Sequence, residues 1–229
     1  MKAQLLIPAA GMGERLGGFE PKALAPLGGK PMLVRTLERF HDAELRGNAV
    51  IVVPPHHRQA FEPVLAAAFP DASFLLVDGG AERQTSVANG LGALDTDTAI
   101  VVIHDAARPF VAAESIDASV AAAIRFGAAT VAVPAVDTVL VADDDQCLSH
   151  TPDRATLWAC QTPQTFQVRV IVEAHRKARE EGFVGTDDAT LVRRYGGKVR
   201  LVMGSPLNFK VTTRTDLALA QCIVKENLA

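Results

Sequence analysis

The sequence predicts an α/β fold in which a mostly parallel central sheet is covered by helices on both faces. Short apolar runs that suit buried strands alternate with amphipathic stretches of helical period along most of the 229 residues. Several apolar runs end in glycine-rich or charged clusters, and the first is followed by Gly11, Gly13, Gly17 and Gly18. Because ligands bind at the carboxyl ends of strands in open α/β sheets, these clusters also predict where the site lies.

The first half of the chain contains four apolar runs separated by three segments of helical character. Strands are predicted at residues 5–7, 49–53, 73–77 and 99–103, and helices at residues 32–43, 59–69 and from the turn at 78–86 to residue 94. In the first of these helices, apolar side chains recur every three or four residues, which places them on one helix face. Pro63 is expected to bend or shorten the second helix because it lacks an N–H group.

The second half continues the alternation but includes one different segment. A helix at residues 114–126 closes at Gly127, and a strand at 128–133 follows. Two short strand-like segments, 137–141 and 147–150, then flank an acidic turn, which is the pattern of a β-hairpin. The rest of the chain is predicted to contain helices at 168–181 and 187–195, a strand at 199–203 and a last helix at 216–224.

The hairpin predicts an extended arm at residues 137–154. Its strands are too short to bury much apolar surface, and an isolated two-stranded hairpin is marginally stable in water. We therefore expect the arm to project and to pair with a second subunit of a homodimer. A hairpin folded back on its own domain is the alternative.

Composition limits the classes of function. A net charge of −3 and a pI of about 6.1, with basic residues dispersed along the chain, argue against a nucleic-acid surface but allow a small anionic ligand. No run approaches the ~20 apolar residues of a membrane span, and the first strand is preceded by neither a secretory signal nor a transit pattern. We expect one cytoplasmic domain over residues 1–229, with no nucleic-acid or membrane partner.

The glycine-rich segment at residues 11–22 predicts a phosphate-binding loop. Glycine permits positive φ and close approach of the backbone, so successive N–H groups can point at one anion. Arg15 and Lys22 add full positive charges, which suit a polyphosphate better than a sugar.

Two familiar phosphate-binding loops do not match this segment. A dinucleotide-binding fold needs an acidic residue at the end of the second strand, where this chain has Pro54 and Pro55. A P-loop needs Ser or Thr after its lysine, whereas Pro31 follows Lys30. A glycine turn that binds nothing is the alternative for the loop taken alone.

Two further strand ends carry polar clusters, at residues 78–86 and 104–108, and both should face the same crevice as the glycine-rich loop. Asp105 is a candidate ligand for Mg²⁺, because a carboxylate oxygen can hold the ion against two phosphate oxygens. Alternatively, Asp105 caps the turn before the next proline. His104 is expected to be structural, and Arg83 and Arg108, each taken alone, could be solvated surface charges.

Five motifs together give a family resemblance. They are residues 6–15 with Pro21-Lys22, Asp78-Gly79-Gly80 with Arg83 and Ser86, His104-Asp105-Ala106-Ala107-Arg108-Pro109, Thr162-Pro163-Gln164, and Asn208-Phe209-Lys210-Val211-Thr212. In this order, from Ala3 to about Cys222, the chain resembles the 2-C-methyl-D-erythritol 4-phosphate cytidylyltransferases. The first motif occurs in many sugar nucleotidyltransferases, whereas the second and third together are much more specific.

The resemblance implies a Rossmann-like nucleotidyltransferase fold and transfer of CMP from CTP to 2-C-methyl-D-erythritol 4-phosphate, a polyol phosphate. Pyrophosphate would be released, and the reaction would belong to the non-mevalonate isoprenoid pathway. The resemblance also implies Mg²⁺ as the divalent cation and a homodimer with exchanged arms. We expect no fused cyclase domain of the kind that bifunctional relatives carry.

The same resemblance assigns roles to the matching residues. The triphosphate would be held by Pro8, Ala9, Ala10, Gly11 and Gly13, and cytosine would be recognised by Gly80, Ala81 and Ser86, with Arg83 ordering that loop. Asp105 would serve the metal and the ribose, and the reacting α-phosphate would be surrounded by Arg15, Lys22 and Lys210. Thr138 and the catalytic Arg154 would reach a sugar phosphate bound mainly by the partner subunit, near Arg108 and Thr186.

The chain departs from the family pattern at two places. Ala23-Leu24 stands where a glutamine and an aromatic residue often follow the lysine, and Leu207 stands where an acidic residue commonly precedes Asn208. These departures bear on the rate more than on the type of reaction. A ribitol 5-phosphate cytidylyltransferase and a catalytically silent nucleotide-binding protein are the alternatives.

Overall fold

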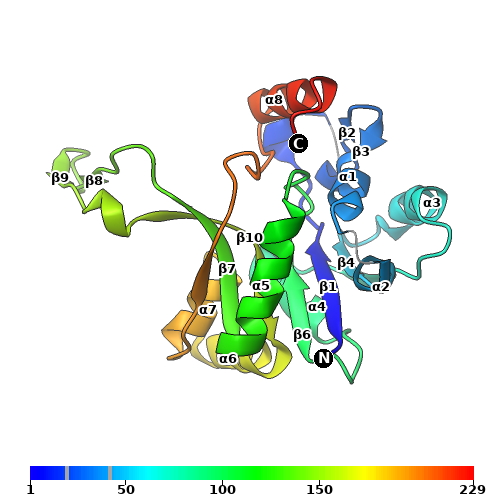
Figure 1. The fold of residues 1–229 in the computed structure, drawn as a ribbon, viewed down its shortest axis with the longest axis horizontal. Coiled ribbons are helices and arrows are strands. Elements are labelled where there is room, and N and C mark those ends of the chain that lie inside the picture. Colours follow the sequence, from blue (N-terminus) through cyan, green and yellow to red (C-terminus); the bar gives the residue numbers. More distant parts are fainter. Residues whose placement is uncertain (19–20, 41–42) are drawn as a thin grey trace.

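The computed structural model describes residues 1–18, 21–40 and 43–229. Within these residues one central sheet contains β1 (Ala3–Pro8), β4 (Val50–Val53), β5 (Leu75–Asp78), β6 (Ile100–Ile103), β7 (Ala128–Pro134), β10 (Trp158–Gln167) and β11 (Arg200–Met203) (Figure 1). The order across the sheet is β11-β7-β10-β6-β1-β4-β5, and only β10 runs antiparallel to its neighbours. The predicted mostly parallel sheet is confirmed.

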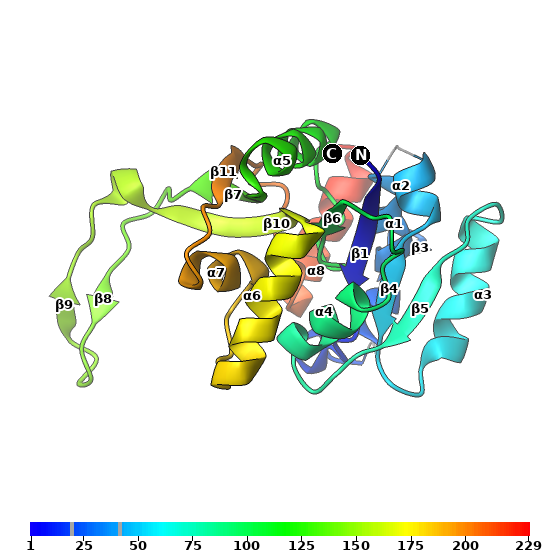
Figure 2. The same ribbon diagram turned by 90° about the horizontal axis from the view of Figure 1, so that it is seen from below.

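Helices cover both faces of this sheet (Figure 2). The α-helices of the described ranges are α1 (Met32–Glu38), α2 (Ala43–Gly47), α3 (Arg58–Ala68), α4 (Arg83–Leu91), α5 (Ala113–Phe126), α6 (Val168–Glu181), α7 (Asp188–Arg194) and α8 (Arg214–Lys225). The layer formed by α1, α3 and α5 packs on one face, and α4, α6 and α7 pack on the other. No helix in the described ranges combines the length and apolar character needed to cross a membrane.

The strands send alternate side chains into the two helical layers. On β1, Leu5 and Ile7 are buried against the layer of α1, α3 and α5, whereas Leu6 is buried on the opposite face with Val87 and Ile171. This alternation is the period of two of an extended strand. Because both faces are covered, the strand appears in the sequence as a continuous apolar run. The sheet thereby fixes the carboxyl end of β1, from which the glycine-rich loop continues.

Gly90 determines how closely α4 approaches the sheet. A Cβ at this position would lie 2.8 Å from Leu6 Cδ1 and 2.9 Å from Val52 Cγ2. We expect Gly90→Ala to lower the free energy of unfolding by about 1–3 kcal/mol, because overpacking forces the helix or these side chains to move. Gly92→Ala is the matched control, since its Cβ would meet only backbone at 3.5 Å or more. Denaturant unfolding of both variants tests the contact, and a Gly90→Ala protein as stable as wild type would contradict it.

β10 is the strand of the central sheet that the apolar pattern did not predict. Residues 151–167 carry no strand signal, yet the structure places ten of them in β10, between β6 and β7. The buried polar side chains of this strand are Gln161, Thr162, Gln164 and Thr165. Gln164 Nε2 donates to Thr130 Oγ1 at 3.1 Å, and Gln164 Oε1 accepts from the Asp188 N–H at 3.0 Å. Hydrogen bonds between distant segments, rather than apolar periodicity, hold this strand in the core.

One predicted helix is shorter in the structure, and a second keeps its length around a proline. The helix predicted at residues 32–43 is represented by α1, which has seven residues, and residues 41–42 lie outside the described part of the chain. The helix containing Pro63 is not shortened, because α3 spans eleven residues around it. Phe61 and Leu65, which are buried on either side of the proline, anchor both halves of α3.

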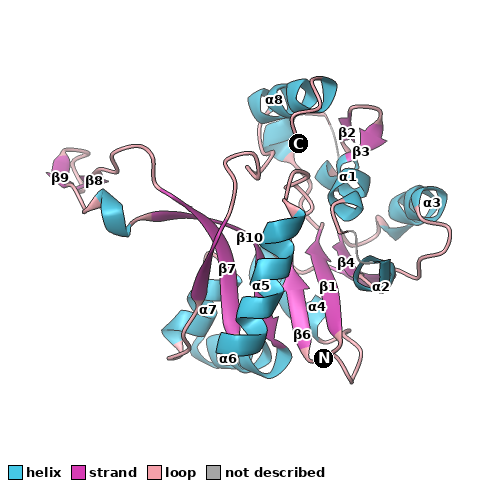
Figure 3. Cartoon of the chain, viewed as in Figure 1, coloured by secondary structure: helices cyan, strands magenta, loops and turns pink. Residues whose placement is uncertain are grey.

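The arm at residues 137–154 projects from the rest of the chain in Figures 1 and 2. Its hairpin consists of β8 (Val141–Ala142) and β9 (Leu148–His150). The first strand is shorter than predicted, because residues 137–140 form no strand, and Figure 3 shows most of the arm as loop. Leu140 and Leu148 remain 60% and 62% exposed, so the alternative of a hairpin folded back on its own domain is wrong.

Candidate active site

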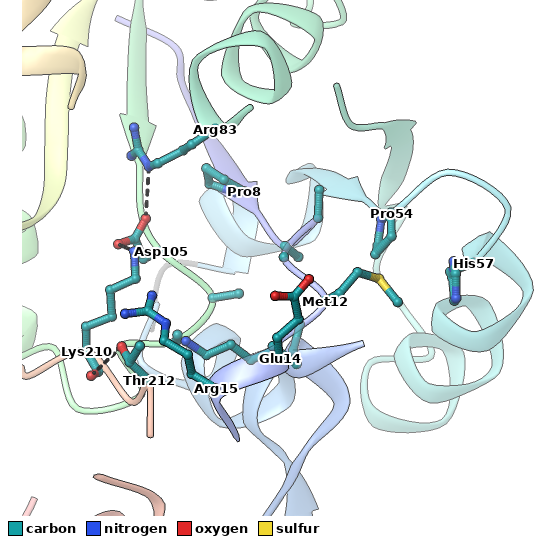
Figure 4. A pocket seen from close by; sticks show the side chains of 18 of the residues that line it. Pro8, Met12, Glu14, Arg15, Pro54, His57, Arg83, Asp105, Lys210 and Thr212 are labelled. Carbon is teal, nitrogen blue, oxygen red and sulfur yellow. Dashed lines mark hydrogen bonds and ion pairs between the residues drawn. The ribbon is translucent and has the colours of Figure 1, made fainter. Parts of the chain in front are cut away.

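A cavity of about 840 Å³ opens at the carboxyl ends of β1 and β6 (Figure 4). Its lining residues are Pro8, Ala9, Ala10, Gly11, Met12, Gly13, Glu14, Arg15, Lys22, Ala23, Pro54, Pro55, His57, Gly80, Ala81, Arg83, Asp105, Ala106, Ala107, Lys210 and Thr212. The three strand-end clusters that the sequence predicts in one crevice therefore meet there, since parallel strands place their carboxyl ends at the same edge of the sheet.

The loop after β1 brings unpaired backbone donors to this cavity. No N–H group of residues 10–13 donates to an acceptor within the described ranges. The flanking N–H groups are satisfied, because Ala9 donates to Val52 O at 2.7 Å and Leu16 donates to Gly13 O at 2.8 Å. Successive unpaired amides beside a cavity suit an anionic ligand.

Gly13 allows Lys22 to pack directly on this loop. The φ angle of Gly13 is +86°, and a Cβ there would lie 2.6 Å from Lys22 Cβ. The Lys22 N–H closes the loop by donating to Gly11 O at 3.3 Å. Glycine is thus required at position 13 both for the backbone conformation and for the close approach of the lysine.

Lys22 belongs to a group of mutually repelling cations. Burial, together with the charges of Lys210 and Arg15, lowers the pKa of Lys22 to about 8, even though Asp105 opposes the shift. Lys22, Arg15 and Lys210 all line the cavity. Cations gathered in a partly buried cavity favour a polyanionic ligand, and a strongly shifted pKa in a cleft is typical of a functional site.

Asp105 is buried on the cavity wall among three cations, and Figure 4 shows it between Arg83 and Lys210. Its Oδ2 lies 2.9 Å from Lys210 Nζ and 3.7 Å from Arg108 Nε, and its Oδ1 lies 3.4 Å from Arg83 Nε. Although burial raises the pKa of Asp105, these three charges hold it well below the usual range. The turn-capping alternative for Asp105 is wrong, and neither Arg83 nor Arg108 is a solvated surface charge.

His104 holds the turn that carries Asp105. Its Nε2 donates to Arg108 O at 3.0 Å, and its Nδ1 accepts from Thr162 Oγ1 at 3.0 Å. The same hydroxyl oxygen accepts from the Asp105 N–H at 3.1 Å. Burial lowers the pKa of His104 to about 4, so the ring is neutral at pH 7. The structural role predicted for His104 agrees with these contacts.

The acidic side chains available to a divalent cation are few. Within the described ranges no group of three or more His, Cys, Asp or Glu side chains could hold a metal, and the cavity is lined by two carboxylates, Glu14 and Asp105. This donor set does not fit a cation held by protein ligands alone. It fits a cation held mainly by the phosphate oxygens of a ligand together with one carboxylate, which is the usual environment of Mg²⁺ in phosphoryl-transfer sites.

The second glycine turn forms the wall of the cavity on the α4 side. Gly80, Ala81 and Arg83 line the cavity, whereas Ser86 lies behind them and is 3% exposed. Ser86 Oγ accepts from the Gly80 N–H at 3.0 Å. In this structure Ser86 therefore fixes the turn and does not reach the cavity surface.

Besides Ser86, four residues predicted for the site lie outside the cavity lining, namely Arg108, Thr138, Arg154 and Thr186. Arg108 lies behind the cavity, where its Nη1 donates to Asn208 O at 2.7 Å and its Nη2 donates to Cys160 O at 3.3 Å. Arg154 lies on the arm, where its Nη1 donates to Val136 O at 3.0 Å. One chain therefore does not bring the whole predicted set together.

Some lining residues were not anticipated from the sequence, namely Pro54, Pro55, His57 and Thr212. The loop after β4 begins with two prolines, whose side chains carry no charge and no hydrogen-bonding group, so the sequence did not indicate a site there. Thr212 lies in the same motif as Lys210, so its place at the site could have been predicted from the sequence. Asp188, which pairs with Arg83 at 2.7 Å, was also missed, because only the tertiary structure brings the start of α7 to the start of α4.

Comparison with known proteins agrees with this geometry. The family model described as IspD, 2-C-methyl-D-erythritol 4-phosphate cytidylyltransferase, matches residues 3–226. A protein of that name from Caldanaerobacter subterraneus is 43% identical over 227 residues, which cover 99% of this chain and 100% of the relative. Another from Geobacillus kaustophilus is 43% identical over 229 residues and 100% of both chains.

Solved structures give the same result. The chain superimposes on 4-diphosphocytidyl-2C-methyl-D-erythritol synthase from Anaerococcus prevotii with a TM-score of 0.86 and 28% identity, over 98% of each chain. For 2-C-methyl-D-erythritol 4-phosphate cytidylyltransferase from Thermus thermophilus the TM-score is 0.81 and the identity 34%, over 98% of this chain and 100% of the other. The family model spans nearly the whole sequence, and full-length relatives share more than two fifths of its residues. The chain therefore belongs to the 2-C-methyl-D-erythritol 4-phosphate cytidylyltransferase family.

Proposed function

We infer that the chain is a cytidylyltransferase that transfers CMP from CTP to 2-C-methyl-D-erythritol 4-phosphate. The reaction releases pyrophosphate and forms 4-diphosphocytidyl-2-C-methyl-D-erythritol in the non-mevalonate isoprenoid pathway. The observation that carries this inference is the convergence of unpaired amides with Arg15, Lys22, Asp105 and Lys210 on one cavity, in a chain of this family. A silent nucleotide-binding protein would tolerate the loss of some of these charges.

The reaction is an in-line displacement at the α-phosphorus of CTP. A phosphate oxygen of the acceptor forms the new bond to phosphorus, and the bond to pyrophosphate breaks, so that pyrophosphate leaves with the electron pair. The acceptor is a phosphate monoester that is already anionic at pH 7, so the protein needs no general base. Its task is to position two polyanions and to neutralise the charge that grows on the equatorial oxygens.

We propose that Lys22, Lys210 and Arg15 stabilise this developing charge. Two opposite unit charges ~4 Å apart attract each other by roughly 4 kcal/mol at an effective dielectric constant near 20. An exposed ion pair contributes only about 0–1 kcal/mol. The partial burial of Lys22 therefore places it in the range where one charge has a large effect on the rate.

The protonation of Lys22 predicts a pH dependence. Lysine carries its charge below its pKa, which is about 8 for Lys22 in the free protein. Because kcat/KM reports the free enzyme, we expect kcat/KM for CTP to fall as the pH rises above about 8, and kcat to stay level to higher pH because bound triphosphate favours the charged form. Lys22→Arg should move the fall to higher pH. A wild-type kcat/KM that stays flat to about pH 10 would contradict this role.

The remaining nucleotide contacts follow from the cavity walls. We propose that Pro8, Ala9, Ala10, Gly11 and Gly13 hold the triphosphate, and that Gly80 and Ala81, with Ser86 and Arg83 supporting the turn, recognise cytosine. Asp105 would face the ribose and the divalent cation, for which we propose Mg²⁺. When bound, the cation would neutralise charge between phosphate oxygens.

We further propose that the arm completes the site of a partner subunit in a homodimer. On the arm, Leu140 and Leu148 are 60% and 62% exposed, which is unusual for apolar side chains unless a second surface covers them. Thr138 and Arg154 lie on this arm and outside the cavity of their own chain. In the dimer they would contact the sugar phosphate, near Arg108 and Thr186 of the subunit that binds it.

Pyrophosphate release tests the reaction and identifies the acceptor. The enzyme is supplied with CTP and Mg²⁺ and with either 2-C-methyl-D-erythritol 4-phosphate or ribitol 5-phosphate, and a reaction without acceptor measures hydrolysis. We expect rapid release with the methylerythritol phosphate alone. Release with ribitol 5-phosphate alone would establish the ribitol enzyme, and no release with either acceptor would favour the silent nucleotide-binding protein.

A further inference from the structure

A row of polar side chains, buried at the end that lies on α6, connects α6 to the cavity. His175 Nε2 donates to Asp188 Oδ1 at 3.0 Å, and Asp188 Oδ2 accepts from Arg83 Nη1 at 2.7 Å. Arg83 Nε then lies 3.4 Å from Asp105 Oδ1, and Asp105 Oδ2 lies 2.9 Å from Lys210 Nζ. Arg83, Asp105 and Lys210 line the cavity, whereas His175 and Asp188 lie behind it.

Asp188 is held in place by hydrogen bonds on both sides of its position in this row. It is the first residue of α7 and is 1% exposed. Its N–H donates to Gln164 Oε1 at 3.0 Å, which ties the start of α7 to β10. Although burial raises the pKa of Asp188, Arg83 and His175 lower it below the usual range, so the carboxylate is charged. A buried carboxylate is tolerated only when it is paired, and here both of its oxygens are.

Arg83 is shared between two buried carboxylates. Its Nη1 pairs with Asp188 at 2.7 Å, and its Nε faces Asp105 at the longer distance of 3.4 Å. Without the charge of Asp188, the guanidinium would keep one anionic partner and would be drawn towards Asp105. Arg83 is the first residue of α4 and follows the turn that contains Gly80 and Ala81, so that shift would move the turn.

We propose that Asp188, oriented by His175, is a positioning residue for nucleotide binding, because it holds Arg83 at the distance from Asp105 that keeps the cytosine turn in place. This proposal rests on the proposed cytidylyl transfer. Asp188 touches no substrate and acts through Arg83. Its removal therefore changes binding of the nucleotide more than the chemical step.

Steady-state kinetics of Asp188→Asn tests the proposal. The asparagine keeps the shape and removes the charge, and we expect KM for CTP to rise about tenfold while kcat changes by less than about threefold. The matched control is Ser119→Ala, which removes a buried hydroxyl that hydrogen-bonds Thr165 at 2.8 Å and has no link to Arg83. Both variants should lose some thermal stability, but only Asp188→Asn should change KM. An unchanged KM in a folded Asp188→Asn enzyme would overturn the proposal.

A double-mutant cycle separates positioning from general stability. In an Arg83→Ala background, Asp188→Asn should change KM for CTP no further, because its effect is transmitted through the guanidinium. Equal effects in both backgrounds would overturn the proposal. If Asp188→Asn fails to fold, His175→Leu and His175→Gln provide the same test. The leucine should raise KM severalfold, and the glutamine, whose amide N–H can still donate to Asp188, should restore it. Equal KM values for these two variants would also overturn the proposal. A wild-type enzyme inactive with both polyol phosphates would instead contradict the proposed function.

Discussion

Replacing Lys22 with alanine is expected to lower kcat by about 10²-fold or more, which corresponds to about 2.7 kcal/mol of transition-state stabilisation. The reason is the position of this lysine: it packs on the phosphate loop at Gly13, is half-buried, and lies close enough to Arg15 and Lys210 to feel their charges. Removing the charge leaves part of the equatorial oxygen charge uncompensated in a site of reduced dielectric. Rates measured at saturating CTP and acceptor give kcat directly.

Lys30→Ala is the matched control for this variant. Lys30 lies in the same N-terminal region but is exposed, pairs with Glu38, and does not line the cavity. Its removal should leave kcat within about twofold of wild type, as is usual for an exposed ion pair. A Lys22→Ala enzyme that turns over at a near-normal rate would remove Lys22 from the reaction.

Mixed dimers of two inactive variants are expected to regain activity. Lys22→Ala damages the cavity of its own subunit, whereas Arg154→Ala damages the arm that reaches the partner subunit. In a heterodimer of the two variants, one site combines an intact cavity with an intact arm, and the other site carries both defects. Random mixing in equal amounts makes half of the dimers mixed, so the mixture should recover about a quarter of the wild-type activity.

The control is each variant mixed with itself, which should stay inactive. The two proteins are unfolded together and refolded, or co-expressed, so that subunits exchange. If each site were built within one chain, every subunit in the mixture would carry a defect and no activity would return. Heterodimers confirmed by mass but without activity would therefore contradict arm exchange.

The sheet was largely predictable from the sequence because it depends on local patterns. Parallel strands covered on both faces are continuous apolar runs, as in β6, where Ile100, Val101, Val102 and Ile103 are all fully buried. β10 was not predictable in this way, since Gln164 and its neighbours are polar side chains that become stable in the core only through partners on other strands and helices. A pattern of apolar spacing contains no information about such partners.

The candidate site was predictable to a similar extent. The loop chemistry around Gly11, Gly13 and Lys22 is local, and parallel topology brings it to Arg83 and Asp105. Lys210 entered only through the family resemblance. The contact between Arg83 and Asp188 spans 105 positions and needed the structure. A single cytoplasmic domain without nucleic-acid or membrane partners stays a prediction from composition.

A crystal structure with a non-hydrolysable CTP analogue and Mg²⁺ tests the central claim most directly. The account predicts that the α-phosphate lies between Lys22 and Lys210, and that the triphosphate oxygens accept hydrogen bonds of about 3 Å from the N–H groups of residues 10–13. A triphosphate bound away from that loop, or an α-phosphate that neither lysine contacts, would contradict it.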